Sequence, residues 1–224
     1  MRTFRILAKL ASYPEADMLA HMAEMTAALE ADGMLKGKTL RHLRDFMKEL
    51  GQGELLSLQE DYVTLFDRAR EHSLHLFEHV HGESRYRGQA MVNLAGLYEE
   101  KGLKIQSGEL PDYLPAFLEF LSVCEPLEAQ SLLDQAVHVI ATIGAKLKKR
   151  GGGYHTVFDA IVTLSKAKLD KEAITKAAAS SLPAEEEDLE ALDKEWAEPE
   201  AFGDDCTLCD TNTGSLGPVA GDTQ

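Results

Sequence analysis

Residues Leu127–Lys148, with the sequence LEAQSLLDQAVHVIATIGAKLK, contain the longest helical pattern in the chain. Apolar side chains recur every three or four residues, which is the spacing of one helix face. Between Ala136 and Ala145 only His138 can carry a charge. A helix that is apolar on most sides is usually surrounded by other helices. We therefore expect this segment to lie at the centre of a helical bundle.

Apolar residues at helical spacing predict further helices on both sides of this segment, with Gly and Pro at their limits. The upstream helices are expected at about Phe4–Ala11, Glu15–Glu30, Leu40–Leu50, Glu54–Phe66 and Ser84–Lys101. The downstream helices are expected at about Pro111–Leu121, His155–Ala167 and after Asp170. Alternating apolar and polar runs joined by hairpin turns, which would indicate strands, are scarce. The predicted fold class is all-α.

The acidity of the chain is concentrated at its C-terminal end. The net charge is −15, and residues 183–224 hold 13 acidic residues and one lysine. Residues 1–182 therefore have 25 acidic and 22 basic residues, a net charge of −3. Neither part has the basic surface that nucleic-acid binding requires. We predict one helical bundle-like domain over residues 1–182 and an acidic, disordered tail over 183–224.

Cysteine content and hydropathy indicate a cytoplasmic protein. The three cysteines form no disulfide framework, as expected in a reducing compartment. Arg5 and Lys9 interrupt the N-terminal apolar residues, and no apolar run approaches the ~20 residues that span a membrane. Phosphate-binding loops, Rossmann glycine patterns and nucleophile elbows are absent from the sequence. We expect a binding protein rather than an enzyme.

Unusual residues are densest in the stretch Tyr62–Met91, YVTLFDRAREHSLHLFEHVHGESRYRGQAM. This stretch has four histidines and four arginines but no lysine. Arginine can hold carboxylates or carbonyl oxygens in pairs through its planar guanidinium group. The segment Leu74–His79 is predicted to be an irregular connection between helices, where function is often found. Arg85 and Arg87 fit either a bound partner or a local network of ion pairs.

Two short patterns are compatible with metal binding. His75, Glu78 and His79 form H-x-x-E-H, in which two histidines bind zinc and the glutamate polarises a water molecule. A glycine follows within one turn, and no further motif clearly supplies a third ligand, so a zinc hydrolase is the weaker alternative. Cys206 and Cys209 offer two of the four ligands of a structural zinc site and are interpreted as incidental residues of the tail.

The segments Leu65–Met91 and Glu109–Pro115 (ELPDYLP) carry a long and specific resemblance to a known family. They resemble the NarJ-type assembly chaperones of respiratory nitrate reductase, within the TorD/DmsD-like redox-enzyme maturation proteins. A looser likeness extends from Leu10–Pro14 to about Trp196. The resemblance implies a TorD-like helical fold and a cytoplasmic chaperone without enzymatic activity. Such a chaperone would bind the catalytic subunit of nitrate reductase, including its N-terminal segment, while the molybdenum cofactor and an iron–sulfur cluster are inserted before membrane attachment.

The family pattern singles out particular residues of the two segments. In the first segment the matching residues are Phe77, His79, His81, Glu83, Arg85, Arg87 and Gly88. In the second they are Glu109, Pro111 and Asp112. Tyr113 stands where many relatives carry histidine, so we do not expect a nucleotide-related role of that histidine here. Tyr86 stands where relatives often carry an acid, so local ion pairing is expected to differ.

We predict a groove that takes the N-terminal segment of the client as an amphipathic helix, with arginines at its rim. The predicted client-binding residues are Tyr62, Phe66, Phe77, His79, His81, Glu83, Arg85, Arg87, Gly88, Met91, Glu109, Asp112, Tyr113 and Phe117. The three aromatic residues before His79 equally fit a plain core, and the two acids after residue 108 equally fit helix caps. No resident cofactor or metal is expected. A chaperone for another molybdoenzyme of the same superfamily is the alternative.

Overall fold

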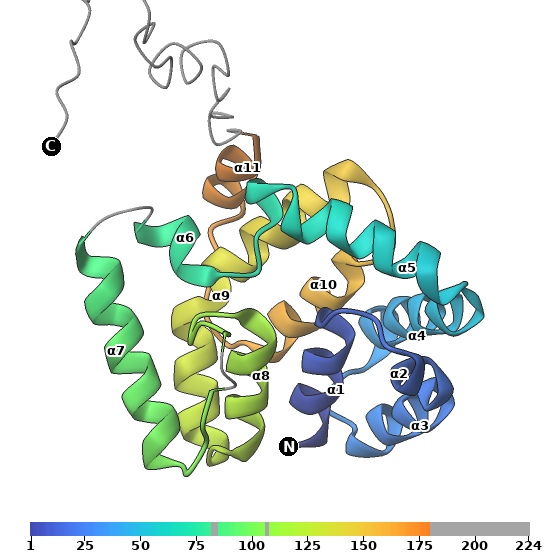
Figure 1. Cartoon of the computed structure of the whole chain (residues 1–224), viewed down its shortest axis with the longest axis horizontal. Coiled ribbons are helices and arrows are strands. Elements are labelled where there is room, and N and C mark those ends of the chain that lie inside the picture. The colour runs from blue at the N-terminus through green and yellow to red at the C-terminus, as the bar shows by residue number, and fades with distance from the viewer. Residues whose placement is uncertain (82–84, 106–107, 180–224) are drawn as a thin grey trace, which may run out of the picture. The chain divides into compact units, whose positions relative to one another are not determined.

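The computed structural model describes residues 1–81, 85–105 and 108–179, which belong to one compact unit, Met1–Leu182. Within these residues the regular structure is helical, apart from one antiparallel bridge between His75 and Tyr113. The predicted all-α fold class is confirmed. The helices, shown in Figure 1, are α1 (Arg2–Ala11), α2 (Ala16–Ala20), α3 (Met22–Asp32), α4 (Gly37–Gln52), α5 (Leu55–Tyr62), α6 (Leu76–His81), α7 (Arg85–Glu100), α8 (Leu114–Val123), α9 (Pro126–Arg150), α10 (His155–Leu164) and α11 (Lys171–Ala179).

Helix α9 occupies the centre that its sequence predicts. It packs against α6, α8, α10 and α11 (Figure 1), and Leu133, Val137, Ile140 and Ile143 are fully buried. It packs tightly on α10 at Gly144, where an added Cβ would lie 2.8 Å from Phe158 Cβ. A larger residue at that position would force the two helices apart. The central helix is therefore positioned by close packing on several sides.

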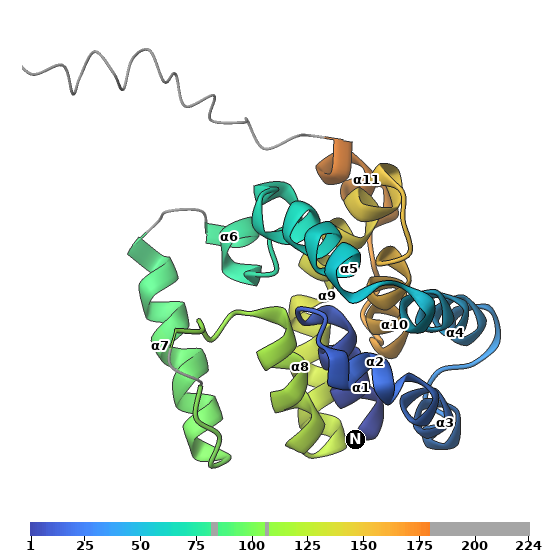
Figure 2. The ribbon, with the colours of Figure 1, turned by 45° about the vertical axis from the view of Figure 1, so that its right-hand side comes forward.

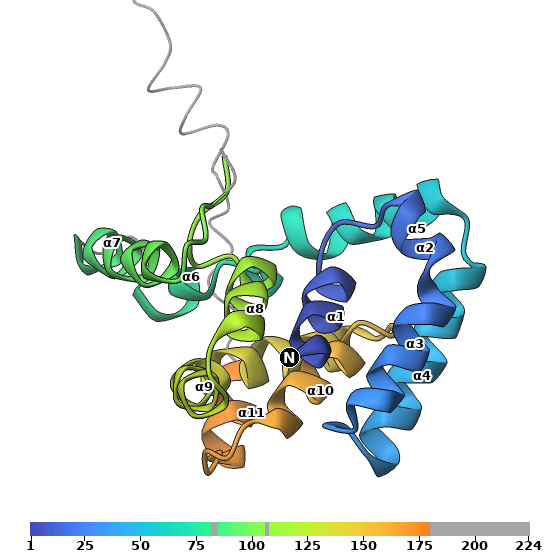
Figure 3. The same ribbon diagram turned by 90° about the horizontal axis from the view of Figure 1, so that it is seen from below.

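Helix α1 forms the second organising contact, against α8. Seen from below (Figure 3), α1 lies beside α8, and it also packs on α3 and α10. Its buried face includes Leu7 and Leu10, which are fully covered. Pro14 lies just beyond the end of the helix, as the sequence predicts. This packing fixes the C-terminal end of α1 next to the segment that precedes α8.

Two predicted segments differ from the structure in detail. The helix expected over Glu15–Glu30 is divided at His21, whose ψ of 13° lies outside the helical region, and α3 ends at Gly33 in the left-handed conformation. The segment Leu74–His79, predicted to be irregular, enters α6 at Leu76, so that part of the prediction is wrong. The apolar residues of this segment pack inward and form a short helix, which a periodicity count over six residues does not detect.

The helix predicted over Glu54–Phe66 is confirmed, with an irregular end. It comprises α5 and a π-helical turn at Val63–Asp67, followed by a 3₁₀ turn at Arg70–His72. π-helical turns insert one extra residue per turn and often occur at functional sites. Here the turn buries Phe66 and leaves Asp67 exposed at the entrance to the pockets described below.

Helix α7 lies at one edge of the unit, and α3 and α4 lie at the other (Figures 1 and 2). Gly82 and Ser84, which precede α7, and the tail predicted over residues 183–224 fall outside the described residues. In the part of the chain that is described, no helix is both long and apolar enough to cross a membrane.

Candidate functional site

Two segments that are far apart in the sequence are joined by backbone hydrogen bonds at His75 and Tyr113. Leu114 N donates to Leu74 O at 2.8 Å, and Leu76 N donates to Asp112 O at 3.0 Å. These bonds surround the antiparallel bridge and connect the start of α6 to the start of α8. The two sequence segments that carry the family resemblance therefore form one continuous structural element.

The side chain of Asp112 holds this element from inside. It is fully buried, and its two carboxylate oxygens accept hydrogen bonds from Phe77 N at 3.0 Å and His75 Nδ1 at 3.3 Å. The alternative expectation that Asp112 caps α8 is wrong, because α8 begins at Leu114 with Tyr113 as its N-cap residue and no side-chain cap. The hydrogen bond to Asp112 raises the pKa of His75.

Tyr62 and Tyr113 connect this element to α1. The Tyr62 hydroxyl donates to Ala11 O at 2.9 Å and lies 3.2 Å from the Tyr113 hydroxyl. Burial raises the pKa of Tyr62 far above its usual range, so its phenol stays protonated and can donate. Three separate chain segments thus meet at two tyrosine hydroxyls, which gives the surface around Tyr113 a fixed shape.

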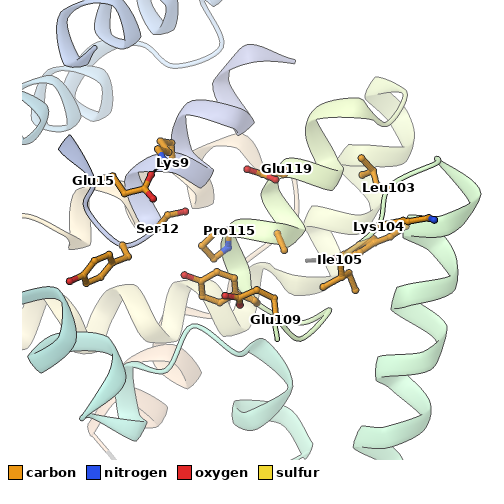
Figure 4. Close-up of a pocket in the computed structure, with 13 residues that line it drawn as sticks. Lys9, Ser12, Glu15, Leu103, Lys104, Ile105, Glu109, Pro115 and Glu119 are labelled. Atoms are coloured by element: carbon orange, nitrogen blue, oxygen red, sulfur yellow. Dashed lines mark hydrogen bonds and ion pairs between the residues drawn. The ribbon is translucent and has the colours of Figure 1, made fainter. Parts of the chain in front are cut away.

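Three pockets meet at Tyr113, which contributes to the lining of each. The first, of about 430 Å³, lies between α1 and α8 (Figure 4) and is called the α1–α8 pocket. The second, of about 440 Å³, is called the tyrosine pocket and is lined by Tyr13, Tyr62, Asp67, His75, Gly108, Glu109, Leu110 and Tyr113. The third, of about 520 Å³, is called the arginine pocket and is lined by Phe66, Asp67, Arg68, Arg70, Ser73, Leu74, His75, Glu78, Arg87 and Tyr113.

The α1–α8 pocket is open and mixed in character. Figure 4 shows Lys9 and Glu15 on one side, the residues Leu103–Ile105 on the opposite side, and Pro115 of α8 between them. Lys9 and Glu15 form an ion pair across the end of α1. The apolar residues from the connection after α7 and from α8 give this pocket a surface on which an aliphatic or aromatic side chain could pack.

The arginine pocket has a net positive lining, in which three arginines outnumber Asp67 and Glu78. Arg68, Arg70 and Arg87 all line it, and Arg87 Nη2 lies 3.2 Å from Glu78 Oε1. This ion pair confirms part of the predicted local network. Since guanidinium groups bind carboxylates well, the pocket can receive an acidic group while the Glu78 contact keeps Arg87 in position.

The H-x-x-E-H pattern does not form a metal site. His75 is held by Asp112, and His79 Nε2 donates to Ser73 O at 2.8 Å. Burial lowers the pKa of His79, so its ring is favoured in the neutral form. Among the residues that the structure describes, no three His, Cys, Asp or Glu side chains are grouped closely enough to hold a metal ion. The histidines of the pattern instead connect α6 to the segments beneath it.

The structure brings five of the predicted client-binding residues to these pockets. They are Tyr62, Phe66, Arg87, Glu109 and Tyr113. The others line none of the three pockets: Asp112 and Phe117 are buried, Phe77, His79 and Met91 are half-buried, and Gly88 is exposed. Glu83 lies outside the described residues, as do the side chains of His81 and Arg85. The part that any of these residues takes in client binding stays a prediction.

Several pocket residues are absent from the client-binding residues that the sequence predicts. They include Tyr13, Asp67, Arg68, Arg70 and Leu110, and the sequence predicts His75 only as a metal ligand. Asp67 and the two arginines lie within the segment Leu65–Met91 that carries the family resemblance. Tyr13 lies in the Leu10–Pro14 segment, where a tyrosine beside a proline gives no sign of its distant neighbours. Only tertiary packing brings it to Tyr62, at a ring-centroid distance of 5.6 Å.

A helical scaffold with a row of open pockets and no grouped metal ligands among its described residues has the features of a binding protein. The sequence profile of the family described as "Nitrate reductase delta subunit" matches residues 36–160. The chain belongs to this family, in the group of NarJ- and NarW-type nitrate reductase molybdenum cofactor assembly chaperones. The resemblance found in the sequence is thereby confirmed, and membership in a group of chaperones agrees with the prediction that the chain is not an enzyme.

Individual relatives cover most of the chain. One is the nitrate reductase molybdenum cofactor assembly chaperone NarJ of Escherichia coli K12, 38% identical over 193 residues, which are 86% of this chain and 81% of the relative. Another, from the same strain, is named "Probable nitrate reductase molybdenum cofactor assembly chaperone NarW" and is 36% identical over 95% of this chain and 89% of its own length. A Bacillus subtilis relative, named as a probable NarJ chaperone, is 29% identical over 68% of this chain and 82% of its own length.

Proposed function

We propose that this protein is a cytoplasmic chaperone for the catalytic subunit of respiratory nitrate reductase. It binds that subunit, including its N-terminal segment, and holds it while the molybdenum cofactor and an iron–sulfur cluster are inserted, before the subunit attaches to the membrane. Both metal groups are cargo for the client and are not assigned to a pocket here. The relatives that are named as nitrate reductase chaperones support the choice of client.

The observation that carries the proposal is the row of three pockets around Tyr113. An extended or helical segment of another polypeptide needs several adjoining recesses, with apolar walls for its side chains and polar groups at the edges. The pockets here combine aromatic walls with charged groups of both signs. Their position against the His75–Tyr113 bridge places them on the two segments that resemble the family. Fixed geometry before binding reduces the entropy that binding costs.

The proposal is tested by calorimetric titration with a peptide of about 20 residues from the N-terminus of the nitrate reductase catalytic subunit of the same organism, a length that would form a helix of about 30 Å. A dissociation constant between about 1 μM and 1 nM is expected for a groove of standard size. Tyr113→Ala should weaken binding at least about tenfold, since Tyr113 lines all three pockets. Leu127→Ala on α9 is the control, because Leu127 is 83% exposed and lines none of the three pockets.

Two outcomes would count against the proposal. Absence of binding to wild-type protein that is folded by circular dichroism would overturn capture of the N-terminal segment. Equal binding by the Tyr113→Ala and Leu127→Ala variants would place the segment elsewhere on the protein. A peptide from another molybdoenzyme, titrated in parallel, tests the alternative client: tighter binding of that peptide would favour a chaperone of the same superfamily with a different partner.

A further inference from the structure

Three of the eight residues that line the tyrosine pocket are tyrosines from separate parts of the chain. Tyr13 follows α1, Tyr62 ends α5 and Tyr113 precedes α8. Tyr13 and Tyr62 meet edge to face at 5.6 Å, and the hydroxyls of Tyr62 and Tyr113 lie 3.2 Å apart. Tyr13 nevertheless remains 43% exposed, whereas Tyr62 is 3% exposed. The pocket therefore has three tyrosine side chains in its lining and is open to solvent on the side of Tyr13.

The charged residues that line the tyrosine pocket are Asp67, Glu109 and His75. Neither Asp67 nor Glu109 forms an ion pair or a side-chain hydrogen bond with a residue that the structure describes. Any positive charge on His75 is balanced by Asp112, which is fully buried behind it. No lysine or arginine lines this pocket, so its carboxylates are not neutralised from within.

Cations do lie close by, in the two neighbouring pockets. Lys9 of the α1–α8 pocket is paired with Glu15, and Lys104 lines the same pocket. Arg68 and Arg87 line the arginine pocket on the other side of Tyr113. Asp67 lines both the tyrosine pocket and the arginine pocket, where three arginines stand against Asp67 and Glu78. The lining therefore changes from net negative at the tyrosine rings to net positive in the arginine pocket.

Aromatic faces attract cations because the π-electrons give each face a negative potential, and nearby carboxylates add to this attraction. An apolar side chain would gain from the rings alone, and an acidic group would be repelled by both carboxylates. We propose that the tyrosine pocket is a subsite for a cationic nitrogen of the bound client segment, either a lysine or arginine side chain or its free α-amino group. The inference rests on the proposed function and specifies the chemistry of the segment that the groove selects.

The change of sign along the groove also sets the direction of the bound segment. A cation in the tyrosine pocket places the adjoining part of the client beside Arg68 and Arg87, where an acidic side chain can pair with a guanidinium group. A segment bound in the reverse direction would bring its cation to the arginines and its acid to Asp67 and Glu109. Like charges would then face each other at both ends, which disfavours that direction.

The test is a double-mutant cycle between protein and peptide, measured by calorimetry on the full-length chain. The test protein is a double variant that carries both Asp67→Asn and Glu109→Gln. The matched control is a second double variant, Asp45→Asn with Glu49→Gln on α4. Both control residues are exposed acids that line none of the described pockets. The probes are the client's N-terminal peptide, versions with each lysine or arginine changed singly to glutamine, and a version with an acetylated N-terminus. The cycle isolates the pairwise coupling.

The native peptide should bind the Asp67→Asn, Glu109→Gln protein about tenfold more weakly, and the α4 control as tightly as wild type. One peptide change should cause a similar loss with wild type and no further loss with that double variant. If a glutamine substitution in the peptide causes this loss, the group bound in the tyrosine pocket is a lysine or arginine side chain. If acetylation of the N-terminus causes it, the bound group is the α-amine. Tyr13→Phe should bind like wild type and Tyr13→Leu more weakly, since only phenylalanine keeps the ring face.

Two results separate the failure of this inference from that of the proposed function. Tight binding of the native peptide that is the same in wild type and in the Asp67→Asn, Glu109→Gln protein would overturn the cationic subsite and leave the chaperone function standing. The same conclusion follows if every peptide change costs equal affinity with both proteins. No binding of the native peptide to wild type would overturn the proposed capture and this subsite together.

Discussion

Helices α9 and α7 are both rich in apolar residues, but the fold covers them very differently. In α9 the middle of the helix is fully buried, including Val137, Ile140 and Ile143. In α7 the eleven residues from Gly88 to Tyr98 carry no charge, and Tyr98 is the only buried one among residues 86–100. Val92 is 66% exposed. Uncharged, apolar-rich sequence thus forms part of the core in α9 but lies largely at the surface in α7.

The difference separates the roles of the two regions. Close packing of α9 with α8 and α10 stabilises the unit and positions the segment that carries Tyr113. Helix α7 adds little buried area, but it contributes Arg87 to the arginine pocket and Tyr98 to the α1–α8 pocket. An apolar helix that its own chain leaves exposed is typical of a surface that another polypeptide covers. This contrast agrees with the proposed capture of a client segment.

The largest effect on stability is expected in the α9–α10 core. Phe158→Ala removes a fully buried ring that packs against Gly144 and Phe66, and it should lower the free energy of unfolding by about 3–5 kcal/mol. Val92→Ala on α7 should change it by less than about 0.5 kcal/mol, because Val92 is mostly exposed. Urea denaturation followed by circular dichroism measures both. Equal losses of unfolding free energy for the two variants would contradict the difference in packing between α10 and α7.

A smaller effect is expected where the edge is attached to the core. Asp112→Ala leaves the Phe77 N–H and the His75 ring without their buried acceptor, which should cost about 1–3 kcal/mol. Asp159→Ala on the exposed side of α10 is the matched control and should cost far less. Thermal unfolding of both variants gives the comparison. A neutral result for Asp112→Ala would show that the bridge at His75 and Tyr113 is held by its backbone bonds alone.

The smallest effect depends on pH. The pKa of His75 is raised by its hydrogen bond to Asp112, so the pair stabilises the fold fully below the unfolded pKa of about 6.5 and loses this effect as pH rises through the folded value. His75→Asn should therefore cost up to about 1 kcal/mol at pH 6 and less at pH 8. Urea denaturation at the two pH values checks it. A larger loss at pH 8 would contradict the assignment of the charge to this pair.

The sequence was sufficient for the fold class and for most helices, because periodicity and breakers depend on neighbouring residues. The central helix α9 and the helix end before Pro14 both follow from local pattern and composition. Much of the candidate site was out of reach for the opposite reason. Tyr13 and Asp67 come from two segments that meet only after packing, and Asp112 points inward to Phe77 instead of capping its own helix.

Amide hydrogen exchange of the free protein and of its complex with the client's N-terminal peptide tests the central contrast most directly. In the free protein, amides in the middle of α9 should exchange only by global unfolding, and those of α7 by local opening at lower free energy. The peptide should slow exchange in α7 and around Tyr113 while leaving α3 and α4 unchanged. Protection confined to α3 and α4, or an α7 that is already as protected as α9 without peptide, would contradict the account.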